Sequence, residues 1–126
     1  MTYPNNIDEA YLSEHPECIF VFGDNELRRG YGGAAHLRWL PNTYGFVTKK
    51  APNNEYEAFY NETTYAPIYE REIARLRCVA RSRPTNTFLI SRVGAGLANR
   101  LGIWEAIIEP KMKRDLADLA NVVFLW

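Results

Sequence analysis

The chain has 126 residues, which suits one domain with one hydrophobic core and is short for two. Fifteen basic and fifteen acidic residues cancel, so net charge favours neither nucleic acid nor a membrane surface as a partner. No stretch approaches the roughly 18 apolar residues of a membrane span, and the polar start Met1–Asn6 shows no signal peptide. We therefore expect a cytoplasmic protein that forms one domain over residues 1–126.

The first half of the chain predicts two strands and a short helix. Residues 1–17 are a polar leader with one helical turn expected near residues 8–12. The run Cys18–Phe22 is continuously apolar and rich in β-formers, which is typical of a strand covered on both faces. Ala34–Leu40 predicts a short helix stopped by the proline that follows it, and Gly45–Lys49 predicts a second strand.

The second half alternates helices and strands. The segment Ala51–Thr64 shows little periodicity and is interpreted as a long loop, a kind of segment that is often functional. Pro67 is expected in the first turn of a helix that ends at Arg83-Pro84. A strand, a helix interrupted at Pro110 and a last strand are expected at Thr87–Ile90, Ile103–Leu119 and Asn121–Trp126. This alternation predicts an α/β fold of three layers with a mixed, mainly parallel sheet.

The two cysteines follow no pattern of metal sites or disulfides. Cys18 opens a strand and Cys78 falls in a helix, and we expect both to be small, reduced core residues. No metal and no cofactor is expected.

Two glycine-rich loops each follow an expected strand. Because parallel strands place their carboxyl ends at one edge of a sheet, both loops should face one ligand. Glycine lets the backbone approach a ligand closely, and bare N–H groups bind phosphate, although the glycines could serve only as turns. The expected ligand-binding residues are Gly23, Asp24, Asn25, Arg29, Gly30, Gly32, Gly33, Ala34, Arg92, Val93, Gly94, Ala95, Gly96 and Leu97.

Charged side chains beside these loops have two interpretations each. Asp24 can accept a hydrogen bond from a base or a ribose, or it can cap the following turn. The guanidinium groups of Arg28, Arg29 and Arg92 can pair with phosphate, or the first two can be solvated. If the protein is an enzyme, Asp24 and His36 are the catalytic candidates, although a lone histidine on a short helix is more often structural.

Six aromatic residues surround the long loop, and one or two of them are expected to stack on a ligand. Known catalytic motifs are otherwise weak, with no nucleophile elbow, metal box or complete dinucleotide fingerprint. The six aromatic residues are Tyr44, Phe46, Tyr56, Phe59, Tyr60 and Tyr65.

The order of these segments resembles macrodomains. The strand Ile19–Phe22, its polar tip and the loop Gly30–Ala35 look like the first ligand loop of that family. Phe88–Leu97 looks like the second loop, and Trp104 follows at a spacing similar to the terminal ADP-ribose glycohydrolase group. The pattern also resembles small bacterial and phage proteins, with Val47–Lys49 as a partial match to a further motif of that group.

This resemblance implies a macro-like fold and a pocket for an ADP-ribose-type nucleotide. It implies Asp24 and Asn25 near the adenine or the distal ribose, with the two loops on either side of the diphosphate. The glycohydrolases have an acid just after Gly-x-Gly-Leu, where this chain has Ala98-Asn99, so binding is favoured over turnover. The expected function is binding of ADP-ribose, a cyclic ADP-ribose derivative or a related NAD-derived signal, including sequestration by a phage counter-defence protein in the host cytoplasm.

Two alternatives stay open. One is an ADP-ribosyl hydrolase that acts on a macromolecule, and the other is a protein-interaction module without a small ligand. A homo-oligomer also stays open, because Trp39 and Trp126 suit either a core or an interface.

Overall fold

Four strands form one sheet in the computed structural model, which describes residues 2–126. The strand order is β2-β1-β3-β4, and all neighbouring pairs are parallel. The α/β fold class is thus confirmed, and the named strands are all parallel, with one isolated antiparallel bridge from Lys49 to Phe59. The strands are β1 (Cys18–Asn25), β2 (Thr43–Lys49), β3 (Thr87–Ile90) and β4 (Val122–Phe124).

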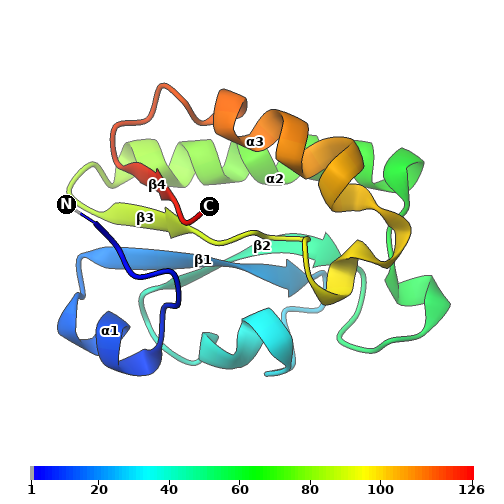
Figure 1. The fold of residues 1–126 in the computed structure, drawn as a ribbon, viewed down its shortest axis with the longest axis horizontal. Helices are drawn as coiled ribbons and strands as arrows, with labels where there is room; N and C mark the ends of the chain where they lie inside the picture. Colours follow the sequence, from blue (N-terminus) through cyan, green and yellow to red (C-terminus); the bar gives the residue numbers. More distant parts are fainter. Residues whose placement is uncertain (1) are drawn as a thin grey trace.

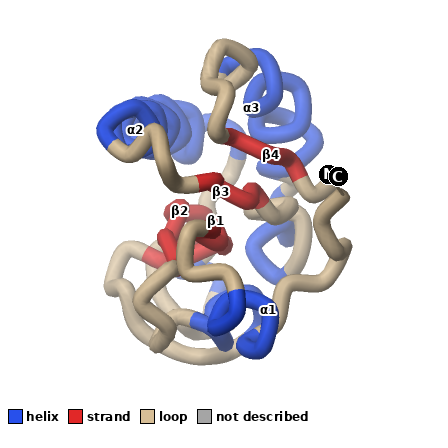
Figure 2. Tube along the Cα trace, turned by 90° about the vertical axis from the view of Figure 1, so that its left-hand side faces the viewer, coloured by secondary structure: helices blue, strands red, loops and turns tan. Residues whose placement is uncertain are grey.

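Helices cover both faces of this sheet, giving three layers (Figures 1 and 2). The helices α2 (Glu62–Ser82) and α3 (Glu109–Asp115) lie on one face. The opposite face carries α1 (Glu9–Glu14) and the 3₁₀ helix η1 (Gly33–Leu37). Alternate β1 side chains enter two separate cores, with Val21 in the core under α2 and Phe22 in the core under η1.

The long helix α2 begins earlier than the sequence predicts. Asn61 caps it, because its side chain accepts from the Thr64 N–H while the Thr64 hydroxyl accepts from the Asn61 N–H. Pro67 therefore lies inside the helix rather than in its first turn, and the predicted start there is wrong. The predicted end is confirmed, since Arg83 is the C-cap and Pro84 follows.

The expected interruption at Pro110 takes the form of a change in helix type. A π-helical turn, η4 (Trp104–Ile108), runs into α3, and Pro110 lies in the first turn of α3. Proline has no N–H to donate, so a position in the first turn of a helix costs it no hydrogen bond. Ahead of this turn, a 3₁₀ helix η3 (Leu97–Leu101) leads out of the second glycine loop.

Three further expectations need correction. The predicted helix at Ala34–Leu40 is the shorter η1, and the loop expected at Ala51–Thr64 contains a 3₁₀ turn, η2 (Tyr56–Ala58), and the start of α2. Cys78 is exposed rather than in the core, because it lies outside the buried stripe of α2. Across residues 2–126, no helix combines the length and the apolar character needed to cross a membrane.

Candidate functional site

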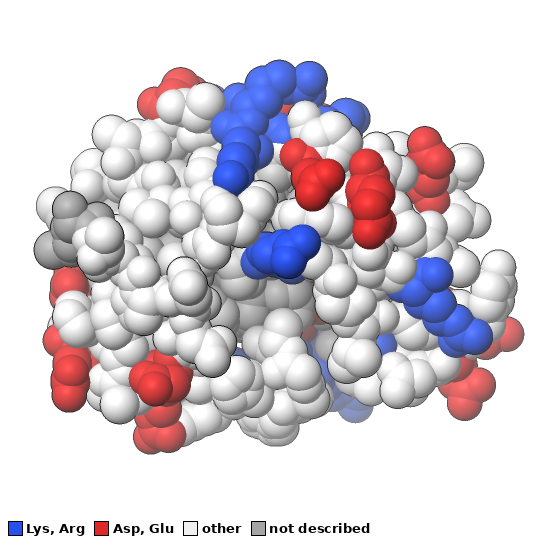
Figure 3. Space-filling view, viewed as in Figure 1, with Lys and Arg blue, Asp and Glu red and all other residues white. Residues whose placement is uncertain are grey.

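A cavity of about 390 Å³ lies at the carboxyl edge of the sheet, where the two glycine loops meet. From β1 the chain proceeds to β2 on one side, and from β3 it proceeds to β4 on the other. The loops after β1 and β3 therefore diverge at a topological switch point, which is where open α/β sheets bind ligands. Figure 3, in the view of Figure 1, shows a hollow near the middle of the molecule with a basic side chain at its rim.

The structure brings nearly all of the predicted ligand-binding residues to this cavity. Only Ala95, partly buried next to Gly94, does not line it. The predicted residues that do line it are Gly23, Asp24, Asn25, Arg29, Gly30, Gly32, Gly33, Ala34, Arg92, Val93, Gly94, Gly96 and Leu97. Because β1 and β3 are parallel, both loops lie at the same edge of the sheet, as expected.

Close packing fixes the second loop. Gly94 has a φ of +83°, and a Cβ there would lie 2.5 Å from Ile108 Cδ1. A Cβ on Gly23 of β1 would lie only 3.6 Å from the Gly94 nitrogen, so the loop runs close over the strand. Across the cavity, a Cβ on Gly33 would come within 3.2 Å of Leu97 Cδ1. The two loops are therefore near enough to hold one group between them.

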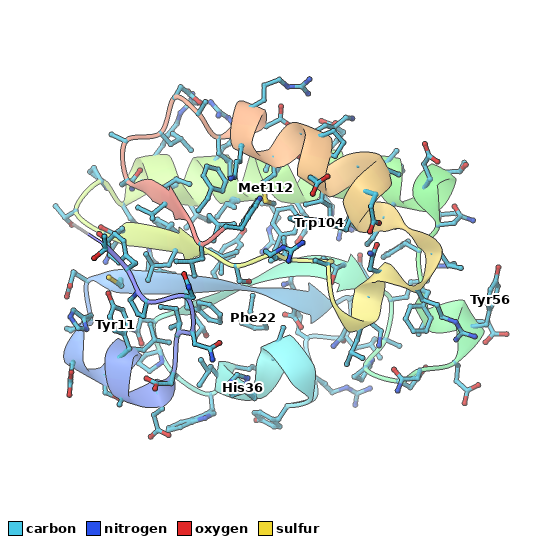
Figure 4. The ribbon with its side chains drawn as sticks, viewed as in Figure 1. Tyr11, Phe22, His36, Tyr56, Trp104 and Met112 are labelled. Atoms are coloured by element: carbon cyan, nitrogen blue, oxygen red, sulfur yellow. The ribbon has the colours of Figure 1, made fainter. Side chains whose placement is uncertain are left out.

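Buried charge fixes the first loop. Asp24 is buried, with 4% of the residue exposed, and its carboxylate accepts from both Nη atoms of Arg38, with Nη1–Oδ2 at 3.0 Å. Arg38 also donates through Nε to the Gly30 carbonyl at 2.8 Å and through Nη2 to the Arg29 carbonyl at 3.1 Å. Its guanidinium lies 5.3 Å from the ring centre of Phe22, a side chain between β1 and η1 (Figure 4). One arginine thus ties the loop to the end of β1.

Arg28 binds the other side of the same carboxylate. Its Nη1 lies 3.2 Å from Asp24 Oδ2 and 2.8 Å from the Gly45 carbonyl. Its Nη2 lies 3.7 Å from Glu72 Oε1, a fully buried carboxylate on α2. Of the two roles considered for Asp24, this geometry supports a structural one, in which Arg28 and Arg38 occupy its carboxylate.

Asn25 shapes the turn after β1. Its Oδ1 accepts from the Leu27 N–H at 3.0 Å, and its Nδ2 donates to the Arg29 carbonyl at 2.8 Å. Glu26, the next residue, accepts from Arg71 at 2.6 Å and from Tyr60 at 3.0 Å. Burial alone would raise the pKa of Glu26, but these two hydrogen bonds hold it below its ordinary value.

Three cations line the cavity from three different strand ends. Arg29 follows β1, Lys49 ends β2 and Arg92 follows β3, and none forms an ion pair within the described chain. Arg92 lies 5.0 Å from the ring centre of the buried Trp104, which orients its guanidinium. The sole acid in the lining is Asp24, whose charge Arg28 and Arg38 already balance. The cavity therefore favours an anion.

Backbone donors add to this preference. Among residues 2–126, the N–H groups of Gly32, Gly94 and Gly96 have no hydrogen-bond acceptor. Gly32 belongs to the first loop and the other two to the second. Unpartnered N–H groups on facing loops suit the oxygens of a phosphate.

Sequence reasoning missed several lining residues. β2 ends at the same edge of the sheet as β1 and β3, and its last residues Thr48 and Lys49 line the cavity. Only the three-dimensional fold brings Pro52 and Asn54 to the same place, because their segment has no motif. The residues that line the cavity without having been predicted are Ala35, Thr48, Lys49, Pro52, Asn54, Ser91 and Ala98.

Other candidates lie elsewhere. His36 is exposed on η1 (Figure 4), its Nδ1 is 2.9 Å from the Gly33 carbonyl, and it does not line the cavity. None of the six candidate aromatic residues lines the cavity either. Tyr65 and Phe46 are fully buried in the core, while Tyr56 points away from the body of the protein (Figure 4). Within residues 2–126, no cluster of three His, Cys, Asp or Glu residues is suited to a metal ion.

The sequence matches a model of one protein family. The model of the family of unknown function DUF7831 matches residues 2–99, so the chain belongs to that family. The match includes β1, β2, β3 and both glycine loops as far as η3. No curated protein and no solved structure matches the chain.

Proposed function

We propose that the cavity binds a nucleotide of the ADP-ribose type, with the diphosphate between the two glycine loops. The single observation that carries this proposal is that the two glycine loops face each other closely. A Cβ built on Gly33 of the first loop would lie 3.2 Å from Leu97 Cδ1 beside the second loop. The resemblance of both loops to macrodomain ligand loops supports the choice of nucleotide. On this proposal the fold is macro-like.

The chemistry of the lining supports a diphosphate in particular. Unpartnered N–H groups from both loops reach phosphate oxygens on two sides, as in other glycine-rich anion sites. Arg92, oriented by Trp104, adds a planar fork of donors that matches phosphate. A volume of about 390 Å³ is within the roughly 300–1,000 Å³ usual for small-molecule sites.

Binding without turnover is the form of the function that the site favours. General acid–base catalysis needs a group free to give or take a proton close to the reacting bond. Asp24 is occupied by two arginines, and His36 lies outside the lining. A protein that binds an NAD-derived signal without cleaving it can sequester that signal, which includes a counter-defence role. If the protein instead releases ADP-ribose from a modified protein, it is a hydrolase.

Titration calorimetry tests the proposal. We expect heat with ADP-ribose, cyclic ADP-ribose or NAD at protein concentrations of about 100 μM, which detects dissociation constants up to the same range. Heat from none of the three would reject nucleotide binding and favour a protein-interaction module.

A pair of variants then tests the position of the ligand. Arg92→Gln removes a cation that lines the cavity and makes no ion pair, so the protein should fold normally and lose about tenfold in affinity. Arg114→Gln removes the same charge from the exposed side of α3, outside the cavity, and should leave affinity unchanged. Equal effects of the two substitutions would place the ligand elsewhere.

A further inference from the structure

Two cations of the cavity come from strands on opposite sides of β1. Neighbouring strands lie about 4.8 Å apart, so β2 and β3, with β1 between them, are about 10 Å apart across the sheet. Arg92 belongs to the β3 side, beside the glycine loops, and Lys49 belongs to the β2 side. Arg92 and Lys49 therefore enter the cavity from opposite sides of β1.

Lys49 is held in place with donor capacity to spare. Its Nζ donates to the Asn53 carbonyl at 2.7 Å and lies 3.5 Å from Asn54 Oδ1. The same nitrogen is 4.9 Å from the ring centre of Phe59, so the ammonium has a fixed position. An ammonium group carries three N–H donors, which leaves one for a ligand. Since Lys49 lines the cavity, that donor is available to a bound molecule.

The charge of Lys49 is also uncompensated. Within residues 2–126 it has no carboxylate at ion-pair distance, and burial lowers the pKa of its amine. Partly buried charge without a partner is unfavourable, and an anion beside it would remove that cost. In the β1–β2 register Lys49 is opposite Asn25, so an anion here would lie across β1 from the loop that carries Arg92.

We propose that the ligand is a nucleoside diphosphate that carries a separate phosphate monoester on its ribose, and that Lys49 binds this extra phosphate. The inference rests on the proposed function, because it assumes the diphosphate between the glycine loops. It adds a class of substrate: nucleotides phosphorylated at the 2′ or 3′ position as well as in the diphosphate.

Calorimetry with two matched pairs of probes tests this assignment. ADP-ribose is compared with ADP-ribose 2′-phosphate, and ADP is compared with adenosine 3′-phosphate 5′-diphosphate. We expect the phosphorylated member of at least one pair to bind about tenfold more tightly, and the pair that responds identifies the position of the phosphate. The gain should shrink as salt is raised from 50 to 500 mM, since the contact is between charges.

Substitutions at two adjacent lysines assign the gain to one side chain. Lys49→Gln should abolish the tenfold difference within the responding pair. Lys49→Arg should retain most of it, since it keeps the charge. Lys50→Gln is the matched control, because Lys50 is exposed, lies over the Tyr60 ring and does not line the cavity. Thermal melting checks that all three variants fold.

Three results would overturn the assignment. Equal affinity within both pairs would show that no extra phosphate is recognised, while ADP-ribose binding would leave the proposed function standing. A gain that survives in Lys49→Gln would assign the phosphate to another cation. Absence of binding for all four probes would reject both the inference and the proposed function.

Discussion

The two loops that form the cavity are held by different physics. In the first loop, Arg38 joins Asp24 to the carbonyls of Arg29 and Gly30, so buried charge sets the conformation. In the second loop, Gly94 fits against Ile108 with no space for a Cβ, so packing sets it. A binding site needs rigid elements on both sides of its ligand. Ion pairs supply that rigidity in the first loop, and close packing supplies it in the second. Different substitutions should therefore destabilise the first loop and the second loop.

The largest expected loss of stability comes from the first loop, whose conformation depends on buried charge. Asp24→Ala leaves Arg38, whose side chain is only 14% exposed, without its carboxylate, and breaking a buried pair costs about 3–5 kcal/mol. Urea denaturation should show this loss of the free energy of unfolding. Asp118→Ala, which removes an exposed carboxylate paired with Arg77 and Arg81, should cost much less. Similar losses for the two variants would mean that Asp24 does not hold the loop.

In the second loop, whose conformation depends on close packing, one added methyl group should destabilise the protein. Gly94→Ala forces a non-glycine residue into a φ of +83° and places its Cβ 2.5 Å from Ile108 Cδ1, so we expect a loss of about 2–4 kcal/mol. Gly32→Ala is the control, since φ there is −80° and its Cβ would meet nothing within 4 Å. Denaturation curves of the two variants should separate clearly. A harmless Gly94→Ala would show that the second loop is not fixed by packing.

The smallest expected effect is the pH dependence of stability that comes from Glu26, next to Asn25 in the first loop. The folded pKa of Glu26 lies below its unfolded value of about 4.3, so its contribution is present above the unfolded value and is lost as pH falls from there through the folded pKa. Its side chain is 33% exposed, which limits the contribution to about 1 kcal/mol after solvent screening. Stability curves of the native protein and Glu26→Gln should differ at pH 7 and converge between pH 5 and 3. A constant difference would remove Glu26 from the network.

The sequence predicts much of the fold because its signals are local. The runs Cys18–Phe22 and Thr87–Ile90 are apolar and β-rich, and both are strands in the sheet. The stop at Arg83-Pro84 was equally local and is confirmed. The predicted start of α2 at Pro67 is wrong, because the capping box that Asn61 and Thr64 form begins the helix at Glu62.

The candidate site was predicted in part for the same reason. Glycines after strands are visible in a sequence, and the parallel sheet brings them together. The pairing of Asp24 with Arg38 was not visible, because it spans fourteen residues and depends on where η1 packs. Pro52 and Asn54 reach the cavity only through the fold of their loop. Long-range contacts of this kind leave no periodic signal in the chain.

The most direct test of the central claim is an NMR titration of the ¹⁵N-labelled protein with ADP-ribose. If the nucleotide binds between the loops, amide signals of Gly32–Ala34 and Gly94–Leu97 should shift together and saturate. Signals of Arg83 and Asn86, which line a separate groove at the opposite end of the sheet, should stay in place. Unchanged signals in both glycine loops at millimolar ADP-ribose, or shifts centred on another surface, would contradict the account.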